Sequence, residues 1–296
     1  MVASKFLNPA NDLAFKRVFG SEKNKDILIH FLNDILERPC LIQEVTFLKT
    51  LQDPEIAPLR VSIVDVMCQD QEKNRFIIEM QISHEKGFDR RALYYASRAY
   101  CSQRTKNKKF KDLKDVYFLA ITNFTPFPTK KTWLSRIGFK DLDTNEHDIK
   151  AIQLFFMQLP FFKKTKKDLK TMSLREKWAY FFKYAEETTE KELETLIGKD
   201  EIIKRAYDEL DRFSWSEKEL NNYESIEMKK MADEAVKEAV FEKGLEEGHK
   251  KGRKEGEKNK SFEIAYALLK QGLAVKQISE ATGLTEKELK NLEGSK

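Results

Sequence analysis

Three residues in the first third of the chain have types and spacings that could bind a divalent metal ion. Asp65 lies in the apolar run VSIVDVMC (61–68), and Glu79 and Gln81 lie in the run RFIIEMQI (75–82) that follows it. Side chains along a strand alternate between its two faces, so Glu79 and Gln81 point the same way. Because the stretch between the two runs is polar, the sequence predicts a β-hairpin that carries all three residues.

The register of this hairpin decides whether the two acids meet. If residues 70–74 form the loop, Gln69 pairs with Arg75, and the same register sets Asp65 directly opposite Glu79. Directly opposed residues have Cβ atoms about 4.5–5.5 Å apart. Two carboxylates that close on an apolar hairpin repel each other and lose hydration, and a hard divalent cation relieves both costs.

Mg²⁺ is the ion that this pair predicts, with Mn²⁺ as the alternative. Mg²⁺ binds through one or two carboxylates together with waters and substrate phosphates, and a bound metal can lower the pKa of water toward neutral. The backbone carbonyl of Met80 could supply a further oxygen. As a bare pattern, however, D-x13-E-x-Q is weak, and the acids could simply occupy a strand end (Asp65) and a solvated face (Glu79).

The segments around the hairpin predict a mixed α/β domain. Helical spacing of apolar residues, with Asn8 or Asn11 as cap and Gly20 as stop, indicates a helical start, and apolar runs indicate buried strands. The expected helices lie at about 8–19, 23–37, 86–104 and throughout 173–213, and the expected strands at 61–68, 75–82, 116–121 and 151–159.

The composition narrows the classes of protein that fit. The chain has 296 residues, 35% of them charged, a net charge of +5, and 21 Phe, 9 Tyr and 3 Trp, which is enough apolar material for a globular core. It has no run of about 18 apolar residues and no apolar secretory segment, so we expect no membrane partner and a cytoplasmic location. The cysteines and histidines share no ligand spacing, which argues against a disulfide scaffold and a zinc site.

Two lysine-rich segments could contact a phosphate backbone, which attracts cations whatever its base sequence. Residues 104–114 and 163–170 contain one acid each, Asp112 and Asp168. Solvated loops of a lysine-rich protein are the equal alternative. The basic residues of the two segments are Arg104, Lys106, Lys108, Lys109, Lys111 and Lys114, then Lys163, Lys164, Lys166, Lys167 and Lys170.

Beyond about residue 213 the chain is dominated by charged helix-forming residues, with glycines at 244, 248, 252 and 256. Four glycines cost a helix about 3–4 kcal/mol relative to alanine, so the segment is either a mobile tether or a helix whose glycine stripe lets another helix approach. In the second case the arm could join copies of the chain. The last segment breaks at Gly272 and Gly283 into three short helical pieces, like a helix-turn-helix that reads DNA or binds protein.

Together these motifs resemble a known nuclease family. NDLAFKRVFG (11–20), ILIHFLNDIL (27–36), VDV (64–66), FIIEMQ (76–81), FDRRALYYASRAY (88–100) and the glycine-repeat tail, in this order, are similar to the recombination-promoting nuclease (Rpn) family, often called PD-(D/E)XK transposases. The resemblance runs over nearly the whole chain. It implies a restriction-endonuclease-like α/β fold, a mixed sheet flanked by helices and followed by a helical tail, and Mg²⁺-dependent cleavage of DNA linked to recombination or mobile elements.

The resemblance also implies roles for individual residues. Asp65 and Glu79 would bind the metal, and Gln81 stands where the wider superfamily keeps a lysine. Glutamine can orient water but brings no charge to the phosphate. Lys16 could supply that charge, and Asp12, four residues away on the same helix face, could support it; otherwise Asp12 stabilises the helix start and Lys16 is its surface partner.

Arg91 and Tyr95 also match family positions, on the helix that follows the motif. They could contact a phosphate or buttress the hairpin. Tyr95 fits a core role better, whereas Arg91 fits a functional one, because an arginine on a packed face needs an anionic partner. Candidate DNA contacts in the first basic segment are Lys108, Lys109 and Lys111.

The sequence therefore predicts three parts: a nuclease-like domain over 1–212, a charged helical arm over 213–260 and a helix-turn-helix-like segment over 261–296. We expect a metal-dependent DNA endonuclease. The alternative is a non-catalytic DNA-binding or assembly protein that retains the nuclease fold, which Gln81 and the weak net charge favour.

Overall fold

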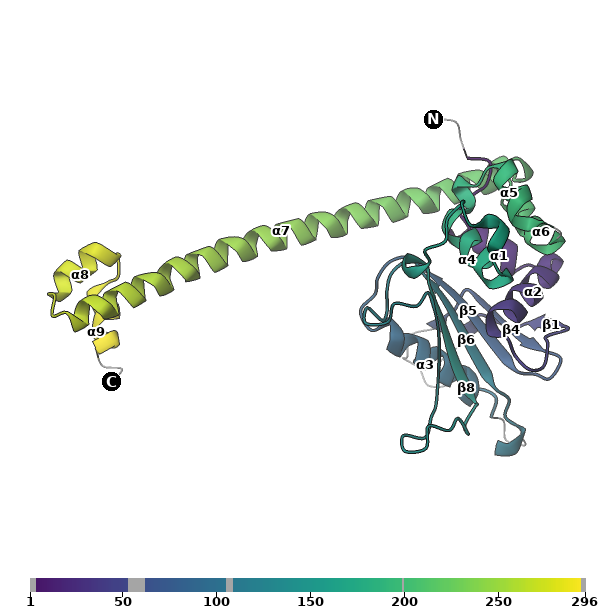
Figure 1. Ribbon diagram of the computed structural model, residues 1–296, viewed down its shortest axis with the longest axis horizontal. Coiled ribbons are helices and arrows are strands. Elements are labelled where there is room, and N and C mark those ends of the chain that lie inside the picture. The colour runs from purple at the N-terminus through teal and green to yellow at the C-terminus, as the bar shows by residue number, and fades with distance from the viewer. Residues whose placement is uncertain (1–3, 53–61, 105–108, 199, 294–296) are drawn as a thin grey trace. The chain divides into compact units, whose positions relative to one another are not determined.

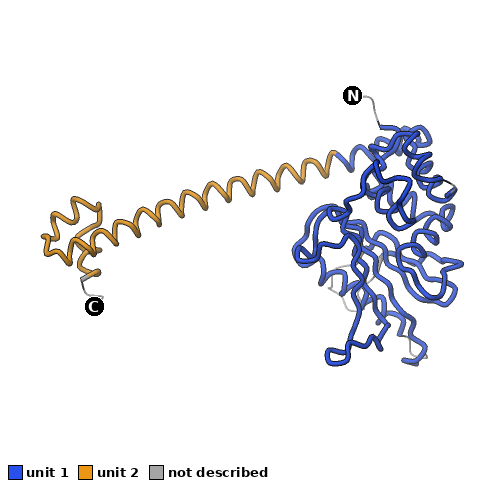
Figure 2. The backbone as a smooth tube through the Cα atoms, in the orientation of Figure 1, with its two compact units in different colours: residues 1–227 blue, residues 228–296 orange. Residues whose placement is uncertain are grey.

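The structure is a computed structural model that describes residues 4–52, 62–104, 109–198 and 200–293 (Figure 1). The chain divides into two compact units, residues 1–227 and 228–296 (Figure 2). No helix within the described residues is long and apolar enough to cross a membrane.

A six-stranded mixed sheet forms the centre of the first unit, in the order β1-β4-β5-β6-β8-β7. Strands β5, β6 and β8 are parallel, whereas β4 runs antiparallel to β5 and β7 antiparallel to β8. The middle strands β6 and β8 are buried along their whole length, as apolar runs covered on both faces must be. The strands are β1 (Val45–Phe47), β4 (Val66–Asp70), β5 (Arg75–Gln81), β6 (Val116–Thr122), β7 (Leu134–Gly138) and β8 (Ile152–Gln158).

The predicted hairpin is β4–β5, and its register is confirmed. Gln69 pairs with Arg75, and the ladder continues to the pair of Val66 and Ile78. The first predicted strand is shorter than expected, because the chain bends at Asp65 and its earlier part, where described, pairs elsewhere. Val61 lies outside the described residues. Strands β2 (Leu51–Gln52) and β3 (Ser62–Ile63) form a separate two-stranded sheet.

A layer of helices packs on one face of the sheet through aromatic side chains. Phe15, Phe19, Phe31, Trp178 and Phe182 are buried here, with ring centroids 5.0–6.2 Å apart in contacting pairs. The helices are α1 (Asp12–Phe19), α2 (Lys25–Leu36), α4 (Leu174–Tyr184), α5 (Glu190–Ile197) and α6 (Glu201–Leu210). The predicted caps of α1 are present: the Asn11 side chain accepts from Leu13 N, and Gly20 ends the helix.

One helix, α3 (Phe88–Cys101), covers the other face (Figure 1). Phe88, Ala92, Ala96 and Ala99 all belong to the core on that face, together with the side chains of the strands below them. Three alanines let the helix lie close to the sheet. Short 3-10 turns join these elements: η1 (Glu22–Asn24), η2 (Phe110–Asp112), η3 (Leu159–Phe161), η4 (Leu169–Thr171), η5 (Ala185–Glu187) and η6 (Arg212–Ser214).

Three helices account for most of the described residues after η6. Helix α7 (Glu217–Lys270) has 54 residues and includes the four-residue glycine repeat, so the repeat is helical. Helices α8 (Val275–Thr282) and α9 (Glu286–Glu293) follow the predicted breaks, where Gly272 and Gly283 have φ of +81° and +71°. The end of α7 packs with α8 and α9 around a small core of Ala265, Ile278, Leu284 and Leu289.

Candidate metal centre

Asp65 and Glu79 lie where the β4–β5 ladder ends. The last paired residues, Val66 and Ile78, are one position short of them. Instead of a further backbone pair, the Oδ2 of Asp65 accepts a hydrogen bond of 2.7 Å from the N–H of Met80. The Asp65 carboxylate thereby takes the place of the next backbone partner of β5. The structure thus brings Asp65 to the end of β5 that carries Glu79.

The two carboxyl groups are poorly solvated. Glu79 is 6% exposed, and its Oε2 atom is buried with no hydrogen-bond partner among the described residues. Burial, and then the nearby charge of Asp65, raise the pKa of Glu79 to about 8, although the Arg91 guanidinium opposes the rise. Burial also raises the pKa of Asp65, against the effect of its hydrogen bond from Met80. The positive charge around the two acids therefore does not offset their burial and mutual repulsion.

Arg91 of α3 joins two of the candidate residues. Its Nη2 donates to Gln81 Oε1 at 2.8 Å and to Glu79 Oε1 at 3.2 Å, and its Nη1 forms an ion pair with Glu85. The Gln81 side chain is held at its other end as well, since its Nε2 donates to the carbonyl of Ser83 at 3.1 Å. The anionic partners of Arg91 in this structure are therefore glutamates.

Tyr95 stands one helical turn beyond Arg91 and is half-buried. The Arg91 guanidinium lies 5.9 Å from the centre of the Tyr95 ring. Burial raises the pKa of the Tyr95 hydroxyl, and the charge of Glu79 adds to this effect, so Tyr95 lies near the acid. It packs against the core on the α3 face without being fully buried.

Asp12 and Lys16 of α1 also lie within electrostatic range of the two acids. They form an ion pair of 2.8 Å, in which both side chains are about half exposed. The charge of Asp12 raises the pKa of Asp65, and the charge of Lys16 lowers the pKa of both Asp65 and Glu79. Lys16 is therefore close enough to act on the site while paired with Asp12.

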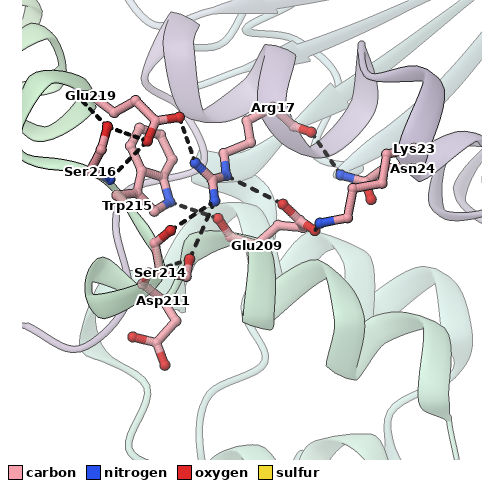
Figure 3. Close-up of polar contacts among 9 residues, drawn as sticks. All are labelled: Arg17, Lys23, Asn24, Glu209, Asp211, Ser214, Trp215, Ser216 and Glu219. Carbon is pink, nitrogen blue, oxygen red and sulfur yellow. Dashed lines mark hydrogen bonds and ion pairs between the residues drawn. The ribbon is translucent and has the colours of Figure 1, made fainter.

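A polar network holds α1 in this position (Figure 3). Arg17 pairs with Glu209 of α6 at 3.3 Å and with Glu219 of α7 at 2.9 Å, and its guanidinium lies 4.5 Å from the ring centre of Trp215. At the other end of α1, Asn11 Nδ2 donates to Glu227 Oε1 at 2.7 Å. The first turns of α7 are therefore part of the structure that positions α1.

Comparisons with known proteins agree with this architecture. The pattern of the PD-(D/E)XK nuclease family transposases matches residues 9–239, which is most of the chain. The chain belongs to this family. The C-terminal helix-turn-helix domain of the Rpn/YhgA-like nuclease family matches residues 258–294. No curated protein and no solved structure matches the chain.

Membership of the PD-(D/E)XK family confirms the restriction-endonuclease-like fold expected from the resemblance, and it relates the chain to nucleases of transposase type. The second match confirms that the last segment is a helix-turn-helix, the kind of domain that binds DNA.

The residues at the site fit the divalent ion that PD-(D/E)XK nucleases use. Two neighbouring carboxyl groups are present, and one oxygen, Oε2 of Glu79, is buried without a partner. A hard cation would satisfy that oxygen and cancel the repulsion that raises the two pKa values. Within the described ranges no three His, Cys, Asp or Glu side chains gather into a metal-binding group, so Asp65 and Glu79 would need water and substrate oxygens to complete a coordination shell.

The basic segments are only partly available for a phosphate backbone. Lys106 and Lys108 lie outside the described residues, whereas Lys109 and Lys111 are exposed. In the second segment Lys164 pairs with Glu176 at 3.0 Å and Lys166 with Glu192 at 3.7 Å. Its other lysines, Lys163, Lys167 and Lys170, are exposed.

Sequence reasoning did not single out Glu85, which pairs with Arg91. Glu85 lies between β5 and α3, where the chain has no regular period, so its direction could not be inferred from spacing. The only signal available was that Arg91 needs an anion.

Proposed function

We propose that this chain is a Mg²⁺-dependent DNA endonuclease in which Asp65 and Glu79 bind the ion, with Mn²⁺ as a substitute. The observation that carries the proposal is the Glu79 carboxyl group, which is buried beside a second acid and has one oxygen without a partner. A purely structural glutamate at this position would be costly, because burial of an unpaired polar group is unfavourable. The bound ion would supply Lewis acidity and a water of lowered pKa.

The Met80 carbonyl is a reasonable third oxygen. In a strand, the N–H and C=O of one residue point to the same side. Since the Met80 N–H donates to Asp65, its carbonyl faces the β4 side as well. This direction supports the assignment of Met80 to the metal site.

In this proposal Gln81 and Lys16 together replace the lysine that the wider superfamily keeps at the position of Gln81. Gln81 orients the water, and Lys16 provides the positive charge. The Gln81 amide is fixed at both ends, by Arg91 and by the carbonyl of Ser83, so it can orient a water with little loss of entropy. Lys16 brings the charge. Its exposed pair with Asp12 contributes only about 0.3–0.5 kcal/mol, so Lys16 can turn to a phosphate at small cost.

The basic segments and the C-terminal domain would hold the DNA. Lys109 and Lys111 are exposed cations on the same unit as the site, and Lys108 stays a candidate by sequence. In α9, Glu288 accepts from Thr285 N and pairs with Lys258 at 2.7 Å, which favours DNA reading by Lys287 and Lys290 over a protein-binding role. A cytoplasmic location, where such DNA is found, belongs to the same proposal.

The alternative is a DNA-binding protein that retains the fold without cleavage. One observation favours it: Arg91 already pairs with Glu79 at 3.2 Å and so neutralises part of the charge that would attract a cation. The two functions differ in whether Mg²⁺ causes the chain to cleave the DNA that it binds.

Nicking of supercoiled plasmid over a range of Mg²⁺ concentrations separates the two functions. We expect nicking by the native chain and none by Asp65→Ala or Glu79→Gln, while Asp143→Asn, an exposed loop acid, serves as a matched control. Melting temperatures measured with and without Mg²⁺ show whether each variant folds and binds the ion. DNA retention without cleavage at every Mg²⁺ concentration would establish the non-catalytic function.

A further inference from the structure

The outer face of α3 has a composition unlike that of an ordinary solvated helix. While Phe88, Ala92, Ala96 and Ala99 face the sheet, the opposite stripe includes exposed Arg90, Leu93 and Tyr94 and half-buried Arg98. Tyr94 is 48% exposed. The stripe, completed by Ser97 and Cys101, contains no carboxylate.

Each exposed aromatic ring in this region is accompanied by a guanidinium group. Arg98 lies 5.8 Å from the ring centre of Tyr94. Just beyond the end of α3, Arg104 lies 5.0 Å from the ring centre of Phe110, which is 75% exposed. Exposed Lys109 and Lys111 flank Phe110. Aromatic rings interleaved with cations are the surface that single-stranded nucleic acid recognises, since bases stack on the rings and phosphates lie beside the cations.

The stripe begins one residue before the arginine of α3 that contacts the candidate metal centre. Arg90 is the neighbour of Arg91, which contacts Glu79 and Gln81. From there α3 runs for 14 residues, or about 20 Å at 1.5 Å per residue, toward Arg104 and Phe110. A strand leaving the site along α3 would therefore meet Tyr94 first and Phe110 later.

We propose that the outer face of α3 binds unpaired nucleotides of DNA next to the cleavage position, with bases stacked on Tyr94 and Phe110 and phosphates beside Arg90, Lys109 and Lys111. In a duplex the faces of the bases are covered by their neighbours, so the rings can serve only nucleotides that are not paired and stacked. The inference rests on the proposed function for its biological meaning: it names DNA with a single-stranded overhang, flap or gap as the substrate class.

Binding is measured first, without metal, so that no cleavage occurs. The probes are a fluorescently labelled 20-nucleotide oligo-dT and a duplex of equal length. Their binding to the full chain in EDTA is measured by fluorescence anisotropy. We expect Tyr94→Ala to weaken oligo-dT binding at least about 5-fold, since one lost base stack is worth that much or more. Tyr94→Phe should retain binding, and duplex affinity should change less than about 2-fold in either variant.

Phe213→Ala is the matched control, because Phe213 is an 86% exposed aromatic residue of the same unit that lies on η6, away from the stripe. Unchanged oligo-dT affinity in Tyr94→Ala, or an equal loss in Phe213→Ala, overturns the inference. So does an equal loss on duplex, which would mean a general phosphate surface.

Cleavage is then compared with Mg²⁺ on a plain duplex and on the same duplex with a 3′ or 5′ overhang. Tyr94→Ala should lower cleavage of the overhang substrates while leaving nicking of plasmid intact. If oligo-dT binding depends on Tyr94 but no substrate is cleaved, the binding surface stands and the proposed nuclease function fails. If plasmid is nicked and oligo-dT binding does not depend on Tyr94, the proposed nuclease function stands and the binding surface on α3 fails.

Discussion

At the scale of single residues, the cost of burying Glu79 is the feature that asks for a chemical explanation. A carboxyl group in a poorly solvated place keeps its proton to higher pH, and a second carboxyl beside it strengthens that tendency. Arg91 relieves only one of its two oxygens. A group held in this state exchanges its proton for a cation readily, because both relieve the same unfavourable charge.

This coupling predicts a pH dependence of stability. The pKa of Glu79 is raised from 4.5 to about 8, so between these values the folded chain holds a proton that the unfolded chain has lost. Stability of the metal-free protein therefore falls as pH rises from about 4.5 to about 8, and the penalty is complete above that. Mg²⁺ needs the ionised group, so the rise in melting temperature that it causes should grow over the same range.

Thermal melts at pH 5 to 9, with EDTA or with Mg²⁺, test this prediction. Glu79→Gln should remove most of the pH dependence of the Mg²⁺ effect, whereas the exposed-loop variant Asp143→Asn should keep it. A Mg²⁺ effect that is constant from pH 5 to 9 would contradict the assigned pKa.

The sequence was informative about residues wherever a strand or helix period applied. The parity of the hairpin predicted Asp65 opposite Glu79, and the observed ladder keeps that register as far as Val66 and Ile78, one position short of the two acids. It could not reveal that Asp65 bonds to the N–H of Met80, because that contact exists only where the ladder stops. It left open whether Arg91 contacts a phosphate or the hairpin, since the direction of a long side chain depends on packing.

At the scale of elements, the hairpin depends on a turn organised by one buried acid. Asp70 accepts hydrogen bonds from the backbone N–H groups of Glu72 and Asn74 and from the Asn74 side chain. It also pairs with the largely buried Arg38 at 2.9 Å. The turn fixes the register, and the register places Asp65 and Glu79, so Asp70 supports the site from the far end of the hairpin.

Asp70→Ala should therefore destabilise the protein by about 3–5 kcal/mol, because it leaves the Arg38 charge buried without its partner. Urea denaturation measures the loss. In a double-mutant cycle, Arg38→Ala combined with Asp70→Ala should cost clearly less than the sum of the single changes. Additive effects would show that the pair is not coupled and that the turn is held by its backbone contacts alone.

Elements with strong periodicity were predicted well, and short ones were not. Helices α1, α2 and α3 and strands β5, β6 and β8 lie close to their predicted ranges. Strands β1 and β7 were missed, since three and five residues are too few for a period to stand out. The sequence did not decide whether the glycine-repeat segment of α7 is a mobile tether or a helix. The cost of four glycines in a helix opposes the preference of the many strong helix formers around them.

At the scale of the whole molecule, the compact first unit extends to residue 227, past the limit of 212 predicted for the nuclease domain. Residues 213–227 contribute buried Trp215 and Tyr223 to the core of that unit. The Tyr223 hydroxyl also accepts from the backbone N–H of Asn8 at 3.0 Å. That the tail is not needed for cleavage stays a prediction. These contacts show that a truncated chain meant to test it should keep residues 213–227.

A chain ending at residue 227 should fold and nick plasmid with Mg²⁺, while one ending at 212 should melt at clearly lower temperature. The shorter chain loses two buried aromatic residues, each worth about 3–5 kcal/mol when removed from a core. Melting curves and the nicking assay compare the two. If the chain ending at 227 folds and binds Mg²⁺ yet cleaves nothing, the tail takes part directly in chemistry.

The exposed surface of α7 within the second unit predicts that the arm joins two copies of the chain. One apolar face of the helix carries residues at the spacing i, i+3, i+4, i+7, i+8 and i+11, namely Met228, Met231, Ala232, Ala235, Val236 and Ala239. Met228 and Met231 are 68% and 65% exposed. Such an exposed apolar face does not stabilise a single chain and is typical of an interaction surface. Helix-turn-helix domains commonly bind paired half-sites as dimers, so a second copy is the occupant that best fits the family match.

Sedimentation equilibrium of the full chain should therefore give a dimer, and the double change Met231→Glu with Val236→Glu should give a monomer because it places four charges in a paired apolar seam. Lys237→Glu is the control, since Lys237 lies on the opposite side of the helix and adds a negative charge outside the seam. Plasmid nicking by the monomer should persist, as the candidate metal residues all belong to the first unit, while affinity for duplex DNA should fall with the loss of the second helix-turn-helix. A native chain that sediments as a monomer, or a double variant that stays dimeric, would place the contact elsewhere and leave the apolar face of α7 to another partner.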